Sequence, residues 1–109
     1  MGNFKINDKT FGCPVDLTLN TIMGKWKAVI LYNLMSGKKR FGELQKLMPD
    51  VTDRVLTKQL RELEMDGIIT RKVYPVVPPK VEYSLTERGK SIKPILDAMS
   101  EWGSKFKVN

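Results

Sequence analysis

The hydrophobic positions of this 109-residue chain change their period twice. Between Pro14 and Gly67 apolar residues recur at intervals of three and four, which is the spacing of one helix face. From Ile69 to Leu85 β-branched and aromatic residues alternate with polar ones, which is typical of strands. Helical spacing returns after Thr86. The pattern predicts one α+β domain with several helices, a hairpin and a final helix.

The N-terminal third of the chain contains two predicted helices. Residues 1–12 are polar and aperiodic, and we expect a flexible arm there. Cys13 and Pro14 open the first helix, because proline suits the first helical position and leaves Cys13 at the N-cap; Gly24 ends it. Residues 25–36 form the second helix. The apolar faces of the two helices consist of Val15, Leu19, Ile22, Trp26, Val29, Ile30 and Leu34.

Two further helices, joined by a tight turn, come next. Residues 38–41 are basic and too few for a central strand, so we expect a connection that ends in a short edge strand. Residues 42–48 form a short helix that the following proline stops. Thr52 then caps a helix of about residues 52–66, which Gly67 ends. The arrangement is a helix-turn-helix, and its second helix is the predicted recognition helix.

The predicted recognition helix has two contrasting faces. Leu56, Leu60 and Leu63 form an apolar stripe, whereas polar and basic residues repeat the same spacing on the opposite side. A charged outer face is most often simply solvated, so it predicts DNA contact only together with the elements beside it. The residues of this helix that we assign to DNA contact are Thr52, Arg54, Thr57, Lys58 and Arg61.

The strand-like segment predicts a hairpin of about residues 69–85, with a stiff, exposed tip at residues 77–80 that contains Pro78 and Pro79. A hairpin beside a recognition helix is the wing of a winged helix-turn-helix domain, and positive charge on it lies where DNA phosphates would be. The basic residues that we add to the DNA-contacting set are Lys39, Arg40, Arg71, Lys72 and Lys80.

The last predicted helix, about residues 86–105, begins at Thr86, and Pro94 should kink it or break it in two. A small domain already has a core from its earlier helices, so another apolar stripe indicates a surface that needs a partner, most simply a second copy of the chain. The alternative is that this helix folds back on its own domain. The predicted dimer-interface residues are Ile92, Ile95, Met99, Trp102 and Phe106.

Composition narrows the possible functions. Nineteen Lys and Arg against twelve Asp and Glu give a formal net charge of +7, which favours an anionic partner such as nucleic acid. No apolar run approaches the ~20 residues of a spanning helix, and the first residues lack a signal-peptide core, so we expect a cytoplasmic protein without a membrane partner. One cysteine and no histidine leave no Cys–His nucleophile pair and no ordinary zinc site. We therefore expect no metal, no cofactor and no enzyme.

Several short segments, in their order along the chain, resemble the sequence motifs of a known protein family. They are Cys13-Pro14-Val15, Gly24-Lys25-Trp26-Lys27, Arg40-Phe41-Gly42-Glu43-Leu44, Leu56 to Glu64, Asp66-Gly67-Ile68, Val76 to Thr86 and Gly89-Lys90-Ser91. In these segments the chain resembles the HxlR-type winged-helix transcription regulators, relatives of the MarR group, over nearly everything from residue 13 to residue 103. The resemblance implies a homodimeric DNA-binding regulator, with additional N- and C-terminal helices that form the dimer interface.

The same resemblance implies a sensor role for Cys13, because the cysteine before the first helix responds to oxidants or electrophiles in several members. A helix N-terminus also favours a reactive thiolate. The alternative is a small buried residue that fills space near the dimer interface. Some sensing members carry further cysteines that complete a disulfide between subunits, whereas this chain has only one. Oxidation would then join the two Cys13 residues of a dimer, if their Cα atoms lie within ~7 Å, or give a mixed disulfide or an adduct.

Two function classes remain open. A dimeric regulator should prefer one near-palindromic, double-stranded operator over random duplex by ~10³-fold or more. A winged-helix interaction scaffold, or a nucleic-acid binder that does not read sequence, should show no such preference.

Overall fold

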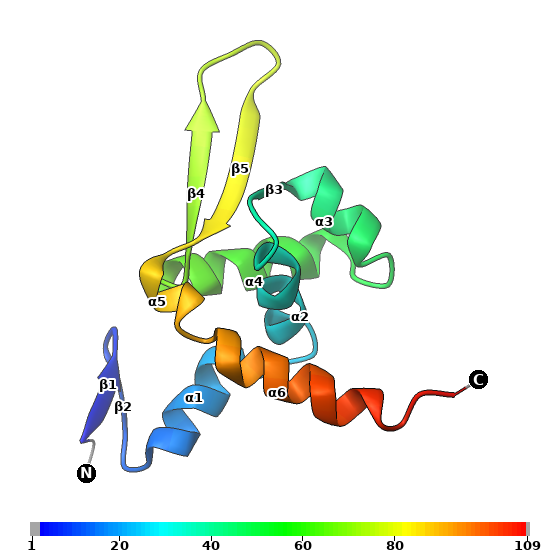
Figure 1. Cartoon of the computed structure of the whole chain (residues 1–109). Helices are drawn as coiled ribbons and strands as arrows, with labels where there is room; N and C mark the ends of the chain where they lie inside the picture. Colours follow the sequence, from blue (N-terminus) through cyan, green and yellow to red (C-terminus); the bar gives the residue numbers. More distant parts are fainter. Residues whose placement is uncertain (1–2, 109) are drawn as a thin grey trace.

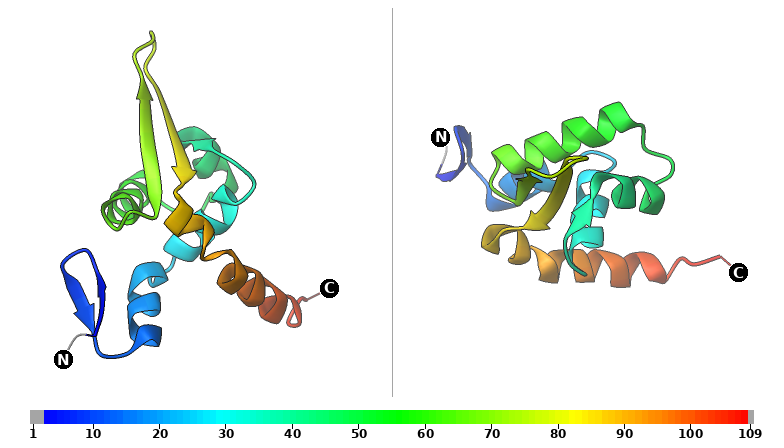
Figure 2. Two further views of the ribbon diagram at one scale, coloured as in Figure 1. Left: turned by 60° about the vertical axis from the view of Figure 1, so that its left-hand side comes forward. Right: turned by 90° about the horizontal axis from the view of Figure 1, so that it is seen from above.

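The computed structural model describes residues 3–108 and has the α+β winged helix-turn-helix architecture that the sequence pattern predicts (Figure 1). The elements in chain order are β1 (Phe4–Ile6), β2 (Lys9–Phe11), α1 (Pro14–Ile22), α2 (Lys27–Leu34), β3 (Lys39–Arg40), α3 (Phe41–Leu47), α4 (Asp53–Met65), β4 (Ile69–Tyr74), β5 (Lys80–Leu85), α5 (Glu87–Lys90) and α6 (Lys93–Ser104). Seen from above, α4 and α6 lie on opposite sides of the domain, with α2 and the wing between them (Figure 2).

The ends of α4, the predicted recognition helix, follow local sequence signals. Thr52 is its N-cap, and the hydroxyl accepts a hydrogen bond of 3.2 Å from the backbone N–H of Val55. Gly67 follows the helix with a φ of 72°, a left-handed conformation that glycine adopts without strain. Both predicted boundaries are therefore confirmed.

The wing belongs to a three-stranded antiparallel sheet with the order β3-β5-β4. The predicted short edge strand is confirmed as β3, in which Lys39 pairs with Tyr83. Strand β4 ends at Tyr74, before the predicted end at residue 76, because the next residue is a proline and cannot donate to the sheet. Lys80, predicted in the tip, instead begins β5 opposite Tyr74.

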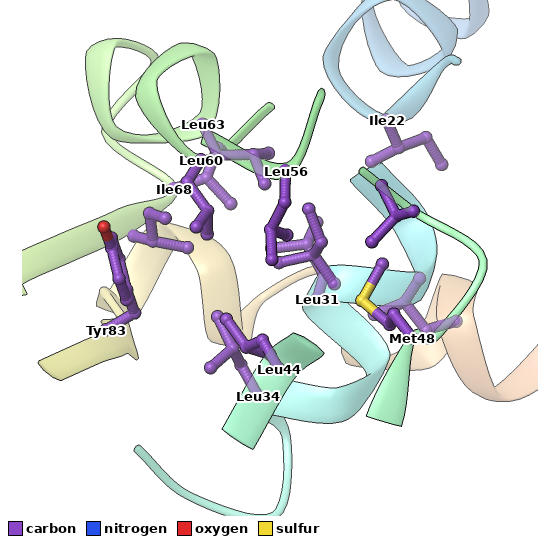
Figure 3. Close-up of a cluster of buried hydrophobic side chains, with 14 of the residues drawn as sticks. Ile22, Leu31, Leu34, Leu44, Met48, Leu56, Leu60, Leu63, Ile68 and Tyr83 are labelled. Atoms are coloured by element: carbon purple, nitrogen blue, oxygen red, sulfur yellow. The ribbon is translucent and has the colours of Figure 1, made fainter. Parts of the chain in front are cut away.

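One core holds the helix-turn-helix and the sheet together (Figure 3). The stripe of Leu56, Leu60 and Leu63 faces this core, and each of these residues is at most 1% exposed. The other fully buried large side chains are Ile30, Leu31, Leu44, Ile68 and Ile69. Helix α4 is thus fixed by its apolar face, which leaves its polar face outward.

The predicted flexible arm is wrong for the residues that the structure describes. Residues 3–12 contain an antiparallel hairpin in which Phe4 pairs with Phe11 and Ile6 with Lys9, and residues 1–2 lie outside the described residues. Ile6 is only 8% exposed and joins the core. Strands of three residues are too short to show a period, which is why the pattern missed them.

Not all apolar positions of the predicted helix faces are buried. On α1, Ile22 joins the core, whereas Val15 and Leu19 are 64% and 54% exposed. On α2, Ile30 and Leu34 are buried, but Val29 is 40% exposed. These helices therefore contribute apolar side chains to the surface as well as to the core.

The C-terminal helix is broken in two, as Pro94 predicts. Thr86 caps the short helix α5, and its hydroxyl accepts a hydrogen bond of 3.1 Å from the Gly89 N–H. Pro94 then lies in the first turn of α6, where its missing N–H is not needed. Leu96, absent from the predicted stripe, is the α6 residue that reaches the core. Within residues 3–108 no helix is long and apolar enough to cross a membrane.

Candidate DNA-binding surface

The outward face of α4 carries most of the basic side chains that the sequence assigns to this helix. Four of the predicted contact residues, Arg54, Thr57, Lys58 and Arg61, line one open groove of about 600 Å³ along the helix. The three cations are exposed, and ion pairs within residues 3–108 engage none of them. Their charge is therefore available to an external anion.

An ion pair between Lys27 and Glu62 links α4 to α2. The Lys27 ammonium lies 3.0 Å from a carboxylate oxygen of Glu62, and Lys27 is only 7% exposed. A buried lysine needs such a partner, because an unpaired charge away from water is strongly unfavourable. The pair therefore adds an electrostatic link to the apolar packing that holds α4.

The predicted wing cations divide between the two faces of the sheet. Directly paired residues point to the same face, so Arg40, Lys72 and Glu82 lie on one face. Lys39 and Arg71 lie on the other face, in register with Tyr83, which is buried. The structure thus does not bring all the predicted basic residues to one surface. Lys80 shares the face of Lys72, because its partner Tyr74 is two residues further along β4.

Tyr74 and Glu82 organise the lysines of that face. The ammonium groups of Lys72 and Lys80 lie 4.8 and 4.9 Å from the centre of the Tyr74 ring, one from each strand. The Glu82 carboxylate, whose side chain is 11% exposed, lies 3.5 Å from the ammonium groups of both Lys38 and Lys80. These contacts fix lysine stems that would otherwise be mobile.

The pKa of Glu82 is lowered in this cluster. The interaction with the Tyr74 side chain is the largest cause; burial acts in the opposite direction, and the positive charges of Lys38 and Lys80 lower the pKa further. Glu82 is therefore a stable anion among cations. Sequence reasoning missed its role and that of Tyr74, although the alternation of β4 places Tyr74 on the face of Lys72.

The predicted dimer-interface residues, with one exception, are exposed apolar residues of α6 and of the segment directly after it. Met99, Trp102 and Phe106 are 49%, 64% and 65% exposed, and the rings of Trp102 and Phe106 lie 4.8 Å apart. Ile95 is 40% exposed. Ile92, at the start of α6, is partly buried and packs against the core of its own chain, and its assignment to the dimer interface stays a prediction.

Cys13 is exposed and lies between the N-terminal hairpin and α1. It occupies the predicted N-cap position in an extended conformation, and its side chain makes no capping hydrogen bond. In the single chain it is therefore not a buried space-filling residue. Its thiol is accessible to solvent.

Comparison with known proteins decides the family. The model of the HxlR-like helix-turn-helix family matches residues 21–109. The chain belongs to the HxlR-like helix-turn-helix family. Among its relatives, the uncharacterized HTH-type transcriptional regulator YdeP of Bacillus subtilis (strain 168) is 57% identical over 101 residues, which cover 93% of this chain and 79% of YdeP.

Solved structures of two regulators are similar to this HxlR-like chain. The redox regulator HypR in its oxidized form superposes with a TM-score of 0.85 at 54% identity, over 89% of this chain and 100% of HypR. Diamide-treated YodB from B. subtilis gives a TM-score of 0.72 at 33% identity, over 89% of this chain and 97% of YodB. The resemblance drawn from the sequence segments is thereby confirmed. The chain is a transcriptional regulator of the helix-turn-helix type.

Proposed function

We propose that this HxlR-like regulator is a homodimer that binds a near-palindromic double-stranded operator. Helix α4 of each subunit enters the major groove, and the wing lies along the phosphates beside it. The observation that carries this proposal is the outer face of α4, where Arg54, Lys58 and Arg61 are exposed and outside every ion pair of the described residues.

The two basic surfaces have different tasks in this proposal. Arginine and lysine side chains on α4 can donate hydrogen bonds to guanine edges, and Thr57 can accept or donate at several bases, so this helix reads sequence. Lys72 and Lys80 project from the wing and neutralise phosphates, which strengthens binding to any duplex. Their stacking on Tyr74 orders them before DNA arrives, and this reduces the entropy lost on binding.

The dimer in this proposal forms through the apolar face of α6. Met99, Trp102 and Phe106 leave large apolar surfaces in water, and burial against a second copy would remove them from it. The exposed Val15 and Leu19 of α1 extend the apolar surface available for this contact. A symmetric dimer presents two α4 helices, which match half-sites about one helical turn apart, ~34 Å.

The test is selection of bound duplexes from a random pool, followed by titration of the selected duplex and of a random one at fixed salt. A reader of sequence should bind the selected duplex ~10³-fold or more tightly, and the selected sequence should show two-fold symmetry. An interaction scaffold, or a binder that ignores sequence, would yield no enriched sequence, and this result would overturn the proposal.

We propose in addition that modification of Cys13 switches DNA binding. The exposed thiol supports this, and so does the similarity to the redox regulator HypR and to YodB, which was solved after diamide treatment. Cys13 sits directly before α1, so an adduct or a disulfide there would displace this helix and the dimer contacts next to it. Diamide titration of operator binding should change the affinity of the parent and not that of Cys13→Ser. Equal responses of the two proteins would exclude this switch.

A further inference from the structure

The C-terminal end of α4 is held by residues that are remote in sequence. The side-chain amide of Asn7, in the turn of the N-terminal hairpin, donates hydrogen bonds of 2.6 Å to the Met65 carbonyl and 2.7 Å to the Asp66 carboxylate. The Lys9 ammonium lies 3.3 Å from the same carboxylate. From α5, the Arg88 guanidinium donates to the Asp66 carbonyl at 2.8 Å. Carbonyls at the end of a helix have no partners within it, and here distant segments supply them.

Asp66 depends on these partners. It is only 3% exposed, and it sits at the helix C-terminus, where the helix dipole disfavours negative charge. A buried carboxylate without its partners is strongly unfavourable. The docked hairpin and the present position of the α4 terminus therefore stabilise each other.

The hairpin also needs this contact. It consists of two strands of three residues each, and an isolated two-stranded hairpin of that length is not stable in water. Ile6 anchors it in the core, and Asn7 has a φ of 53°, a left-handed conformation that asparagine tolerates. This conformation belongs to the turn that brings the Asn7 amide and the Lys9 ammonium to Asp66.

We propose that Asn7 and Lys9 are positioning residues for DNA recognition. They clamp the C-terminal end of α4 through Asp66 and so fix the direction in which the outer face of α4 meets the groove. Neither residue lies among those we assign to DNA contact. The inference rests on the proposed function, because it assigns the hairpin a part in sequence discrimination by α4.

Three hairpin variants and one control test the clamp. Asn7→Asp keeps the size of the side chain and tolerates the same backbone, but it replaces the amide donor by a second carboxylate next to Asp66. Lys9→Met removes the cation. Asn7→Gly is the milder version, which keeps the left-handed turn without adding charge and remains usable if Asn7→Asp does not fold. The matched control is Lys5→Met, which removes the same charge from an exposed position of the same hairpin.

Two measurements are compared across these proteins. Amide hydrogen exchange at residues 66–68 reports the clamp without DNA, and it should be faster in the three clamp variants than in Lys5→Met. The ratio of affinities for the selected and random duplexes reports positioning, and it should fall about tenfold in the clamp variants and stay unchanged in Lys5→Met. Loss of positive charge alone would weaken both duplexes by the same factor.

Each combination of exchange rate and affinity ratio either supports or overturns the proposal. Faster exchange together with a lower ratio supports the proposal. Faster exchange with an unchanged ratio means that the hairpin only stabilises the fold, and unchanged exchange means that the contacts do not clamp α4; either result overturns the proposal. Failure of the proposed function is separate, because the parent protein would then prefer no duplex before any variant is compared, and exchange would still decide whether the clamp exists.

Discussion

Helices α4 and α6 are both amphipathic, yet their outer faces have opposite character. Both bury an apolar side in the same core, through Leu60 in α4 and Leu96 in α6. The outer face of α4 carries exposed cations, whereas that of α6 carries the exposed rings of Trp102 and Phe106. The two helices lie on opposite sides of the domain (Figure 2).

A charged face and an apolar face suit two different kinds of partner. A charged face is well solvated alone, so its binding must come from long-range attraction that salt weakens. An exposed aromatic face is unfavourable in water, and its binding should follow the apolar area that it buries and depend little on salt. In the proposed function, DNA binds the first face and a second copy of the chain binds the second.

Substitutions on the apolar face of α6 should have the largest effect on operator binding. Met99→Ser with Trp102→Ser should give a monomer by light scattering, because the apolar area that would be buried is removed. Loss of the second recognition helix should then weaken operator binding by about a hundredfold or more. Val73→Ser, which removes exposed apolar surface from the wing, is the control and should stay dimeric. A stable dimer in the double variant would place the interface elsewhere.

The basic face of α4 should give the next largest effect. Arg54→Ala with Lys58→Ala should lower operator affinity by about 1–3 kcal/mol per lost base contact and relax sequence preference, while light scattering still shows the dimer. The control is Lys90→Ala on α5, which removes an exposed charge away from α4. If the double variant binds the operator as the parent does, this face does not read the sequence.

The wing lysines should give a smaller, sequence-independent effect. Lys72→Gln and Lys80→Gln should each weaken specific and random duplexes by similar factors, and the slope of log affinity against log salt should fall in magnitude by ~0.9 per lost phosphate contact. Lys105→Gln, at the end of α6, serves as the comparison. Identical slopes in parent and wing variants would contradict phosphate contact.

The smallest effect concerns the carboxylate within the wing. Because the folded state lowers the pKa of Glu82, the unfolded chain takes up its proton first as the pH falls; this contribution is present above the ordinary value of 4.5 and is lost in more acidic solution. Glu82→Gln should therefore flatten the fall of the melting temperature below about pH 4.5. Glu87→Gln removes a carboxylate that is 94% exposed and should leave the curve unchanged. Parallel curves for Glu82→Gln and the parent would refute this role.

The elements that the sequence predicts well have local signals. Thr52, Gly67 and Pro94 each mark a helix boundary through their own backbone or side-chain chemistry, and the structure has each boundary where expected. The N-terminal hairpin has no such signal. It is stabilised by Asp66, 59 residues after Asn7, and no local pattern contains that contact.

The candidate site also has one part that the sequence predicts, the outer face of α4, and one part that it does not, the arrangement of side chains on the wing. Helical period alone finds the outer face of α4, because each position on a helix has a fixed direction. The wing depends on strand register, which places Lys39 on the face of Arg71 and Lys80 on the face of Lys72. The stacking of Lys80 on Tyr74 likewise requires the register of β4 and β5, which the predicted hairpin does not specify.

Strand β4 is an outer strand of the three-stranded sheet, and it leaves one row of backbone donors and acceptors without a neighbouring strand. Such an edge can recruit a strand from another molecule and start aggregation, and charged side chains oppose this. Arg71 and Lys72 therefore oppose such pairing in addition to giving the wing positive charge. Replacing both by valine would leave β4 without any charged residue, and such an uncharged β-forming segment has the composition of amyloid-forming strands. Engineered wings with weaker DNA affinity should therefore carry glutamine at these positions instead.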